Sequence, residues 1–224
     1  MKQLLLLAAL AVSTCGFAQI SIIPKVGVNV SNAAISENND YPGQKSLLGL
    51  TAGLGINFPL TSDAFLSVQP EILYSQKGWA GESSNALAGY EGTYRLNYLE
   101  VPLLLKINFG GETIRAYVNA GPSFGYLLGG RVDGRLTALG VELFNIDDKL
   151  EFTETPSLTN LNQIDANRTE IGLNFGGGAG YSFGGKVLFV DVRYNLGLSD
   201  YNRSFESKNR VFALTAGLQI PLGE

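Results

Sequence analysis

Apolar and polar residues alternate with period two along eight segments of the chain, and this alternation is typical of strands with two different faces. The segments cover residues 25–30, 48–58, 66–77, 98–108, 114–126, 171–181, 188–196 and 212–220. In segment 48–58, for example, Leu, Ala, Ile and Phe at even positions oppose Gly, Thr and Asn at odd positions. Every charged residue within the eight segments lies on the polar face. The pattern therefore predicts an all-β chain.

The connections between these segments differ in length. Three are short and rich in Gly, Asp and Ser, at residues 59–63, 109–113 and 182–186. Four are long and polar, at residues 31–46, 78–93, 129–169 and 199–209. An even number of strands with short turns on one rim and long loops on the other is typical of a bacterial outer-membrane barrel. We therefore expect an eight-stranded antiparallel transmembrane β-barrel with short periplasmic turns and long extracellular loops.

The start of the chain has the pattern of a secretory signal peptide. A basic second residue precedes an apolar run over residues 4–12, and small residues at positions 16 and 18 fit a cleavage site. We predict a signal peptide at 1–18 and an outer-membrane β-barrel domain at 19–224. Two alternatives are a buried N-terminal helix and a lipoprotein signal at Cys15.

Alternation alone does not show which face meets lipid, because a soluble lipocalin-like barrel has eight strands and hides its apolar face. Most glycines of the segments lie on the polar face, where they would leave room for long side chains inside a narrow barrel. The apolar face is uncharged, and Lys or Arg at the membrane midplane would cost about 2–4 kcal/mol. Aromatic residues near the long loops suggest an interfacial belt: Tyr74, Trp79, Tyr94, Tyr126, Tyr181 and Tyr194. We expect outer-membrane lipid around the barrel and a location in the bacterial outer membrane.

Composition narrows the chemistry that is available. The 224 residues include 28 Gly, one Cys and no His, and 16% are charged. Without His the chain has no Ser-His-Asp triad, no Cys-His dyad and no His-ligated zinc, and one Cys excludes an intrachain disulfide. The net charge of −4 argues against nucleic acid as a partner. We expect no enzymatic activity, no cofactor and no metal.

Charged residues on the polar face would point into the barrel. The residues predicted to form the interior charge network are Lys25, Glu71, Glu100, Lys106, Arg115, Asp191 and Arg193. Buried charges are costly unless they are paired, so we expect a network of ion pairs that fills the interior. Glu71 and Glu100 are expected at similar mid-height on neighbouring strands, with Arg193 at a comparable level. The alternative is a paired-carboxylate acid/base site at these two glutamates.

The longest loop carries an acidic run that could interact with a partner. Its members are Asp147, Asp148, Glu151 and Glu154. A solvated loop is the favoured interpretation, and Ca²⁺ binding is the alternative. Segments 141–145 and 150–153 alternate around 146–149, which suggests a hairpin that extends the fifth and sixth strands. The glycine run 176–180 resembles a phosphate loop, but it continues as a strand and lacks the following helix that such a loop needs.

Three stretches resemble the PorT-like outer-membrane β-barrel family of Bacteroidetes-type bacteria. They are YLEVPLLLK at 98–106, AYVNAGPSFGY at 116–126 and RYNLGLSD at 193–200, and the opening KVGVNVS at 25–31 is also similar. The resemblance covers the chain from the predicted cleavage site onward. It implies an integral outer-membrane protein, and the namesake member is linked to secretion of proteases across the envelope.

These observations favour a non-enzymatic, monomeric barrel that serves envelope structure or surface interaction through its long loops. The alternative is an assembly factor of a protein secretion system, with envelope or secretion-system proteins as partners. A membrane-embedded lipid-modifying enzyme is disfavoured because it usually needs a His or an activated Ser. A channel is disfavoured because eight strands enclose a lumen that side chains fill.

Overall fold

The computed structural model describes residues 19–35, 43–85, 87–153, 162–201 and 207–223. Eight long strands dominate it: β1 (Ser21–Ile35), β2 (Gln44–Pro59), β3 (Leu66–Ser84), β4 (Ala88–Gly110), β5 (Ile114–Ala138), β9 (Thr169–Phe183), β10 (Lys186–Gly197) and β11 (Ser207–Pro221). Three shorter strands are β6 (Val141–Lys149), β7 (Glu151–Phe152) and β8 (Gln163–Ile164). The predicted signal peptide at 1–18 lies outside the described residues. Within the described part of the chain, no helix has the length and apolar character needed to cross a membrane.

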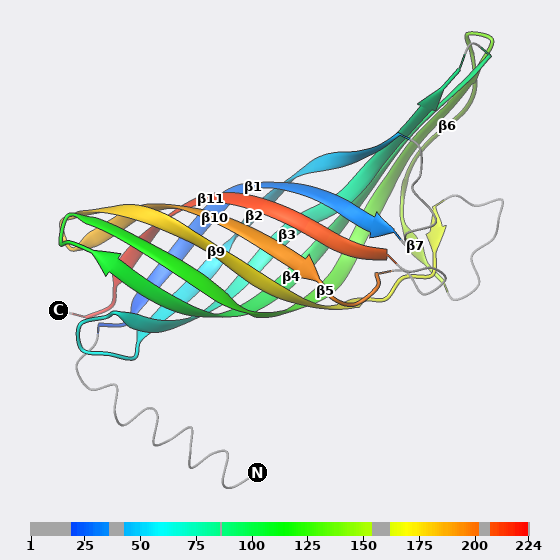
Figure 1. The fold of residues 1–224 in the computed structure, drawn as a ribbon. Helices are drawn as coiled ribbons and strands as arrows, with labels where there is room; N and C mark the ends of the chain where they lie inside the picture. Colours follow the sequence, from blue (N-terminus) through cyan, green and yellow to red (C-terminus); the bar gives the residue numbers. More distant parts are fainter. Residues whose placement is uncertain (1–18, 36–42, 86, 154–161, 202–206, 224) are drawn as a thin grey trace, which may run out of the picture.

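The eight long strands close into a ring in which every neighbouring pair is antiparallel. The order around the ring is β1, β2, β3, β4, β5, β9, β10 and β11, and β11 pairs back onto β1. Figure 1 shows the resulting barrel. Each of the eight predicted segments lies within one of these strands, so the predicted antiparallel barrel is confirmed.

The short turns lie together at one end of the barrel, where the described chain also begins and ends (Figure 1). Strands β9 and β10 are joined by Gly184 and Gly185, whose φ angles of +53° and +76° suit a two-residue hairpin turn. The other two short connections, at 60–65 and 111–113, join β2 to β3 and β4 to β5.

At the opposite end, β3, β4 and β5 continue past the barrel and form a ribbon together with β6 (Figure 1). The ribbon consists of residues 79–84 of β3, 88–96 of β4, 131–138 of β5 and the whole of β6. Large parts of the expected loops 78–93 and 129–169 are therefore strand, which corrects the sequence-based prediction.

The expected hairpin through 146–149 is also wrong. The chain reverses earlier, at Leu139 and Gly140, and β6 pairs with β5 rather than leading toward β9. Both turn residues have positive φ, 51° and 77°, which is the backbone of a two-residue hairpin turn. Leucine is an unusual residue at a position with positive φ, so this turn could not be predicted from residue type.

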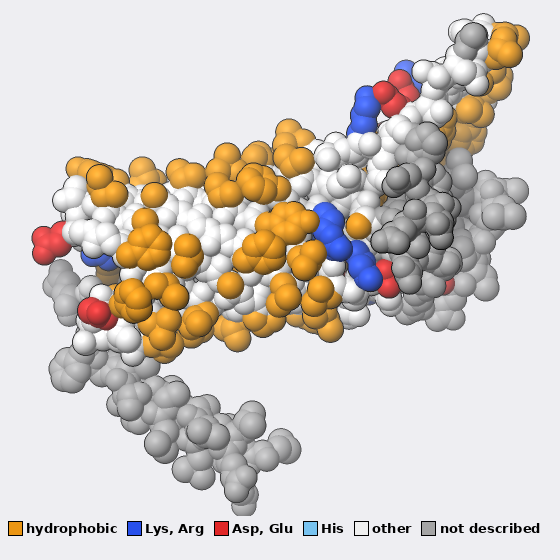
Figure 2. Space-filling view, viewed as in Figure 1, with side chains coloured by type: hydrophobic (Ala, Val, Ile, Leu, Met, Phe, Trp, Pro, Cys, Tyr) orange, Lys and Arg blue, Asp and Glu red, His pale blue; other side chains and the backbone are white. Residues whose placement is uncertain are grey.

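The exterior of the barrel is apolar and the interior is polar. Val26 and Val190 are 62% and 51% exposed, whereas their neighbours Lys25 and Asp191 are 6% and 1% exposed. Figure 2 shows hydrophobic side chains spread along the barrel wall. A lipocalin-like barrel would have the opposite arrangement, so the assignment of the apolar face to lipid is supported.

The long-loop end of the lumen is closed by an apolar cluster, which we call the apolar cap. It consists of Ala33, Leu96, Tyr98, Leu127, Val132, Leu150, Ala166 and Tyr201. Trp79 and Tyr94 stack with ring centroids 4.9 Å apart and pack against this cap. They therefore belong to the inward face and not to the predicted interfacial belt. Tyr181 is outward but lies near the short turn after β9, whereas Tyr74, Tyr126 and Tyr194 lie as predicted.

Candidate functional site

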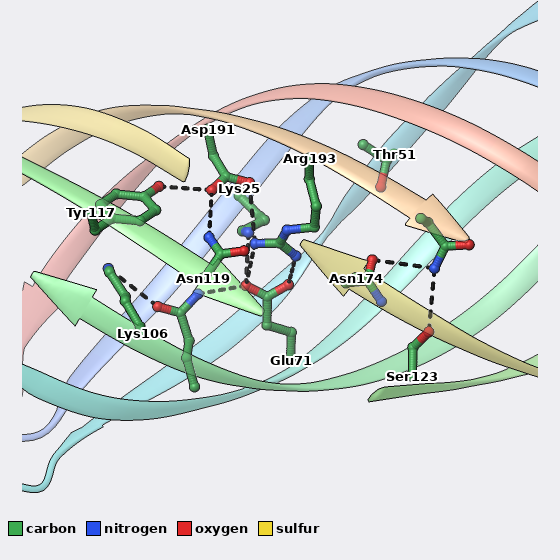
Figure 3. Close-up of polar contacts among 12 residues, drawn as sticks. Lys25, Thr51, Glu71, Lys106, Tyr117, Asn119, Ser123, Asn174, Asp191 and Arg193 are labelled. Carbon is green, nitrogen blue, oxygen red and sulfur yellow. Dashed lines mark hydrogen bonds and ion pairs between the residues drawn. The ribbon is translucent and has the colours of Figure 1, made fainter. Parts of the chain in front are cut away.

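A cluster of charged side chains centred on Glu71 occupies the middle of the lumen (Figure 3). The Lys25 Nζ lies 2.7 Å from the Glu71 Oε1, and the Arg193 Nη1 lies 2.7 Å from the Glu71 Oε2. The Arg193 Nη2 also lies 3.1 Å from the Asp191 Oδ1. We call these four residues the Glu71 cluster. Because Glu71 is only 2% exposed, its charge is compensated by these cations and not by water.

Strand register explains why such long side chains fit inside a narrow barrel. Lys25 is flanked by glycines on both neighbouring strands, Gly53 of β2 and Gly217 of β11. Each other member of the cluster lies opposite a glycine on one neighbouring strand, in the pairs Glu71 and Gly55, Asp191 and Gly178, and Arg193 and Gly176. A glycine beside each charge leaves the volume that a side chain would otherwise take, as the sequence pattern predicted.

Neutral groups and Lys106 complete the surroundings of the Glu71 cluster. The Tyr117 hydroxyl and the Asn119 amide donate hydrogen bonds of 3.0 Å and 3.1 Å to Asp191. Lys106 lies 3.9 Å from the centroid of the Tyr117 ring and donates a 3.4 Å hydrogen bond to Gln69. Lys106 therefore joins the network through an aromatic ring and an amide, with no direct ion pair among the described residues.

A second cluster, centred on Lys77, lies nearer the long loops. The Lys77 Nζ lies 2.7 Å from carboxylate oxygens of both Glu100 and Glu170, and the Lys77 side chain is fully buried. Asn209 donates a hydrogen bond to Glu170, and the Tyr98 ring centroid lies 4.9 Å from the Lys77 Nζ. Neither Lys77 nor Glu170 was in the predicted network. Alternation with Gly172 and Asn174 places Glu170 on the inward face, so its omission came from a strand start set one residue too late.

Glu71 and Glu100, which were predicted to lie at similar height on neighbouring strands, belong to different clusters in the structure. Glu100 lies opposite Leu73 and binds Lys77, whereas Glu71 binds Lys25 and Arg193. Because each carboxylate has its own cation, the geometry does not support a paired-carboxylate acid/base site. The buried charged residues of the described chain balance, with four cations and four anions: Lys25, Lys77, Lys106, Arg193, Glu71, Glu100, Glu170 and Asp191.

Arg115 does not join either cluster. It is exposed and lines a vestibule of about 760 Å³ that opens at the short-turn end of the barrel. Lys106, Tyr117 and Phe189 also line this vestibule. Deeper in the lumen, a cavity of about 30 Å³ lies among residues of both clusters. This volume is about that of one or two water molecules, so side chains fill most of the lumen between the vestibule and the apolar cap.

The described acidic residues of the longest predicted loop are exposed to solvent. Asp147, Asp148 and Glu151 are exposed, and Glu154 lies outside the described residues. Asp147 pairs with Arg131 at 3.1 Å and lies opposite Asp133 on β5. The pKa of Asp133 is raised, mainly because the carboxyl group is partly buried. A hydrogen bond with the Asp147 carboxylate and the negative charge of Asp147 raise this pKa further. Within the described chain no three His, Cys, Asp or Glu residues lie close enough to hold a metal ion.

Comparison with known proteins identifies the architecture. A family model described as an outer membrane protein beta-barrel domain matches residues 17–203. The solved structure of OprG from Pseudomonas aeruginosa is similar, with 13% identity, coverage of 93% of this chain and 98% of that one, and a TM-score of 0.50. Neisserial surface protein A has 14% identity, coverage of 92% and 100%, and a TM-score of 0.47. Ail of Yersinia pestis has 13% identity, coverage of 91% and 100%, and a TM-score of 0.40. No curated protein matches the chain.

Proposed function

Because the chain belongs to the family of outer membrane protein beta-barrel domains, we propose that it is a non-enzymatic barrel that makes surface interactions through its ribbon. It lies in the bacterial outer membrane, where the short turns of such barrels face the periplasm and the long loops face the outside. The ribbon therefore extends outward from the cell surface.

The exposed tip and open edge of the ribbon carry this proposal. Leu139, Val141 and Leu143 are 77%, 60% and 62% exposed, although they lie beyond the barrel wall. Strand β6 is the last strand of its sheet and pairs only with β5 among the described residues. Exposed apolar side chains on an unpaired strand edge are typical of protein-binding surfaces.

The filled lumen supports an anchoring role over transport. Two ion-pair clusters and the apolar cap occupy the barrel between the vestibule and the long loops. An open pore needs more strands than an eight-stranded ring provides. The absence of His from the sequence supports the non-enzymatic part of the proposal, since the common hydrolytic mechanisms use His as the general base.

Deletion of residues 136–162 tests the proposal. Among the described residues, the deletion removes the last three residues of β5, the strands β6 and β7, and Leu150 of the apolar cap. We expect the shortened protein to insert and to keep heat-modifiable migration on gels, because the pairing of β5 with β9 over residues 114–126 is retained. Photocrosslinking from position 147 of the full-length protein should capture the same partner in repeated experiments. A crosslinker at position 82, which lies in the ribbon but outside the deletion, should capture that partner in the full-length protein and lose it in the shortened one. An unchanged crosslinking pattern from the rest of the long-loop rim would contradict a role for the ribbon.

A second candidate is an assembly factor of a secretion system, which the resemblance to PorT-like proteins favours. The vestibule supports it, because it gives such a factor a polar hollow on the periplasmic side. Crosslinkers at Glu112 and Asp147 separate the two candidates. Specific products from the short-turn rim alone would favour the assembly factor, and products from the ribbon alone would favour surface interaction.

A further inference from the structure

Two cations at the start of β11 lie on the outer wall of the barrel. Lys208 and Arg210 alternate with Ser207 and Asn209, which are 0% and 2% exposed and point into the lumen. Since side chains alternate along a strand, Lys208 and Arg210 point outward. Figure 2 shows Lys and Arg side chains at the long-loop border of the apolar wall, near where β11 begins in Figure 1.

These two cations differ from three others at the same rim, which are paired. Lys45 pairs with Glu82, and two arginines of the ribbon pair with carboxylates of β6. Neither Lys208 nor Arg210 forms an ion pair with a carboxylate of the described residues. Two cations on successive outward positions, without a carboxylate partner in the part of the chain that the structure describes, favour an external anionic ligand.

Backbone contacts hold the guanidinium of Arg210 in place. Its Nη1 donates hydrogen bonds of 2.7 Å to the carbonyl of Gly197 and 3.2 Å to the carbonyl of Asn209. Carbonyl acceptors leave the positive charge uncompensated, and a guanidinium has five N–H donors. Arg210 is therefore positioned with donors to spare for a planar or tetrahedral oxyanion.

An aromatic surface lies directly below these cations on the barrel wall. Phe212 is 49% exposed, and its partner across the strand pair is Tyr194. The Tyr194 ring lies 5.4 Å from that of Phe175. Aromatic side chains of this kind mark the level of lipid headgroups. The pair of cations is therefore at the depth where lipid phosphates lie.

We propose that Lys208 and Arg210 bind the phosphate of an anionic outer-leaflet lipid, with its acyl chains against Phe212, Tyr194 and Phe175. The binding site lies in the plane of the membrane and is separate from the ribbon. The ligand class follows from three features: two cations that no described carboxylate pairs with, N–H donors suited to a phosphate, and an adjoining apolar aromatic surface.

Native mass spectrometry of the full-length protein in detergent micelles tests this inference. The probe is bis-phosphorylated lipid A, compared with the same lipid after removal of its phosphates. One cation near an anionic lipid contributes on the order of a fivefold gain in affinity, so Lys208→Gln with Arg210→Gln should weaken binding about thirtyfold. Lys45→Gln is the matched control, because that rim lysine already has a carboxylate partner.

Four outcomes decide the proposal. Selective loss of phosphorylated lipid in the double variant, with restored binding in Lys208→Arg with Arg210→Lys, supports it. Failure of inorganic phosphate to displace the lipid also supports it, since the acyl chains then contribute. Equal binding of the dephosphorylated lipid, or unchanged affinity in the double variant, overturns it. Heat-modifiable migration of each variant confirms that the barrel is folded in every case.

Discussion

Removal of the charge on Glu71 should destabilise the barrel strongly. Glu71→Gln keeps the shape of the side chain but removes the anion that Lys25 and Arg193 share. Asp191 would remain as the one carboxylate of the Glu71 cluster, and it is already bound by Tyr117. Two buried cations would then face one anion.

The expected size follows from the burial of these groups. Lys25, Glu71 and Arg193 are 6%, 2% and 6% exposed, so water does not compensate the lost charge. Removal of one partner from a buried ion pair typically costs about 3–5 kcal/mol. Changing Lys25 to Met together with Glu71→Gln should recover part of that loss, because the remaining Arg193 and Asp191 form a balanced pair.

Urea unfolding in lipid vesicles measures the effect, with the fluorescence of Trp79 as the probe, since it is the one tryptophan of the chain. Glu82→Gln is the control, because its ion pair with Lys45 is exposed and should contribute less than about 1 kcal/mol. A loss below about 0.5 kcal/mol for Glu71→Gln would refute the view that the interior charges hold the barrel together.

Three further predictions concern other parts of the molecule. Lys77→Met alone should cost about 3–5 kcal/mol in the same unfolding assay, and changing both of its glutamate partners to Gln as well should restore most of the loss. Gly217→Leu should reduce the yield of folded barrel on heat-modifiability gels, because a Cβ there would lie 2.5 Å from the Phe189 ring, whereas Gly111→Leu in a turn should not. The raised pKa of Asp133 means that its stabilising contribution is present below the unfolded pKa of about 3.9 and is lost as pH rises through the folded pKa. Hydrogen exchange, corrected for its intrinsic pH dependence, should therefore show a better protected β6 at acidic pH, and Asp133→Asn should remove that difference.

Sequence reasoning reached the barrel because its two faces follow directly from alternation. Outward valines and leucines, inward charges and inward glycines all repeat every second residue, and this period does not depend on knowing which strands pair. The glycine beside Lys25, for instance, could be anticipated as a source of space, although its partner strand could not. Strand identity and face are therefore local properties of this chain.

Contacts across the lumen could not be predicted in the same way, because they depend on register and on where each strand ends. Glu71 and Glu100 were placed at one level, but Glu100 lies opposite Leu73, two residues further along β3 than Glu71. This offset assigns the two carboxylates to different cations. Trp79 was assigned to lipid because its strand was ended too early. Extended to residue 84, the same alternation places it inward.

The ion pairs of the lumen join strands that are far apart in the order of synthesis. Glu71 and Arg193 are 122 residues apart, and Lys77 and Glu170 are 93 residues apart. A partly assembled sheet that lacks its final strands would expose single charges to hydrocarbon, at a cost of several kcal/mol for each ion. Burial of each charge thus becomes favourable only when the complementary strand has arrived. Insertion is thereby coupled to completion of the chain, because an incomplete barrel with unpaired charges is unfavourable in the hydrocarbon of the bilayer.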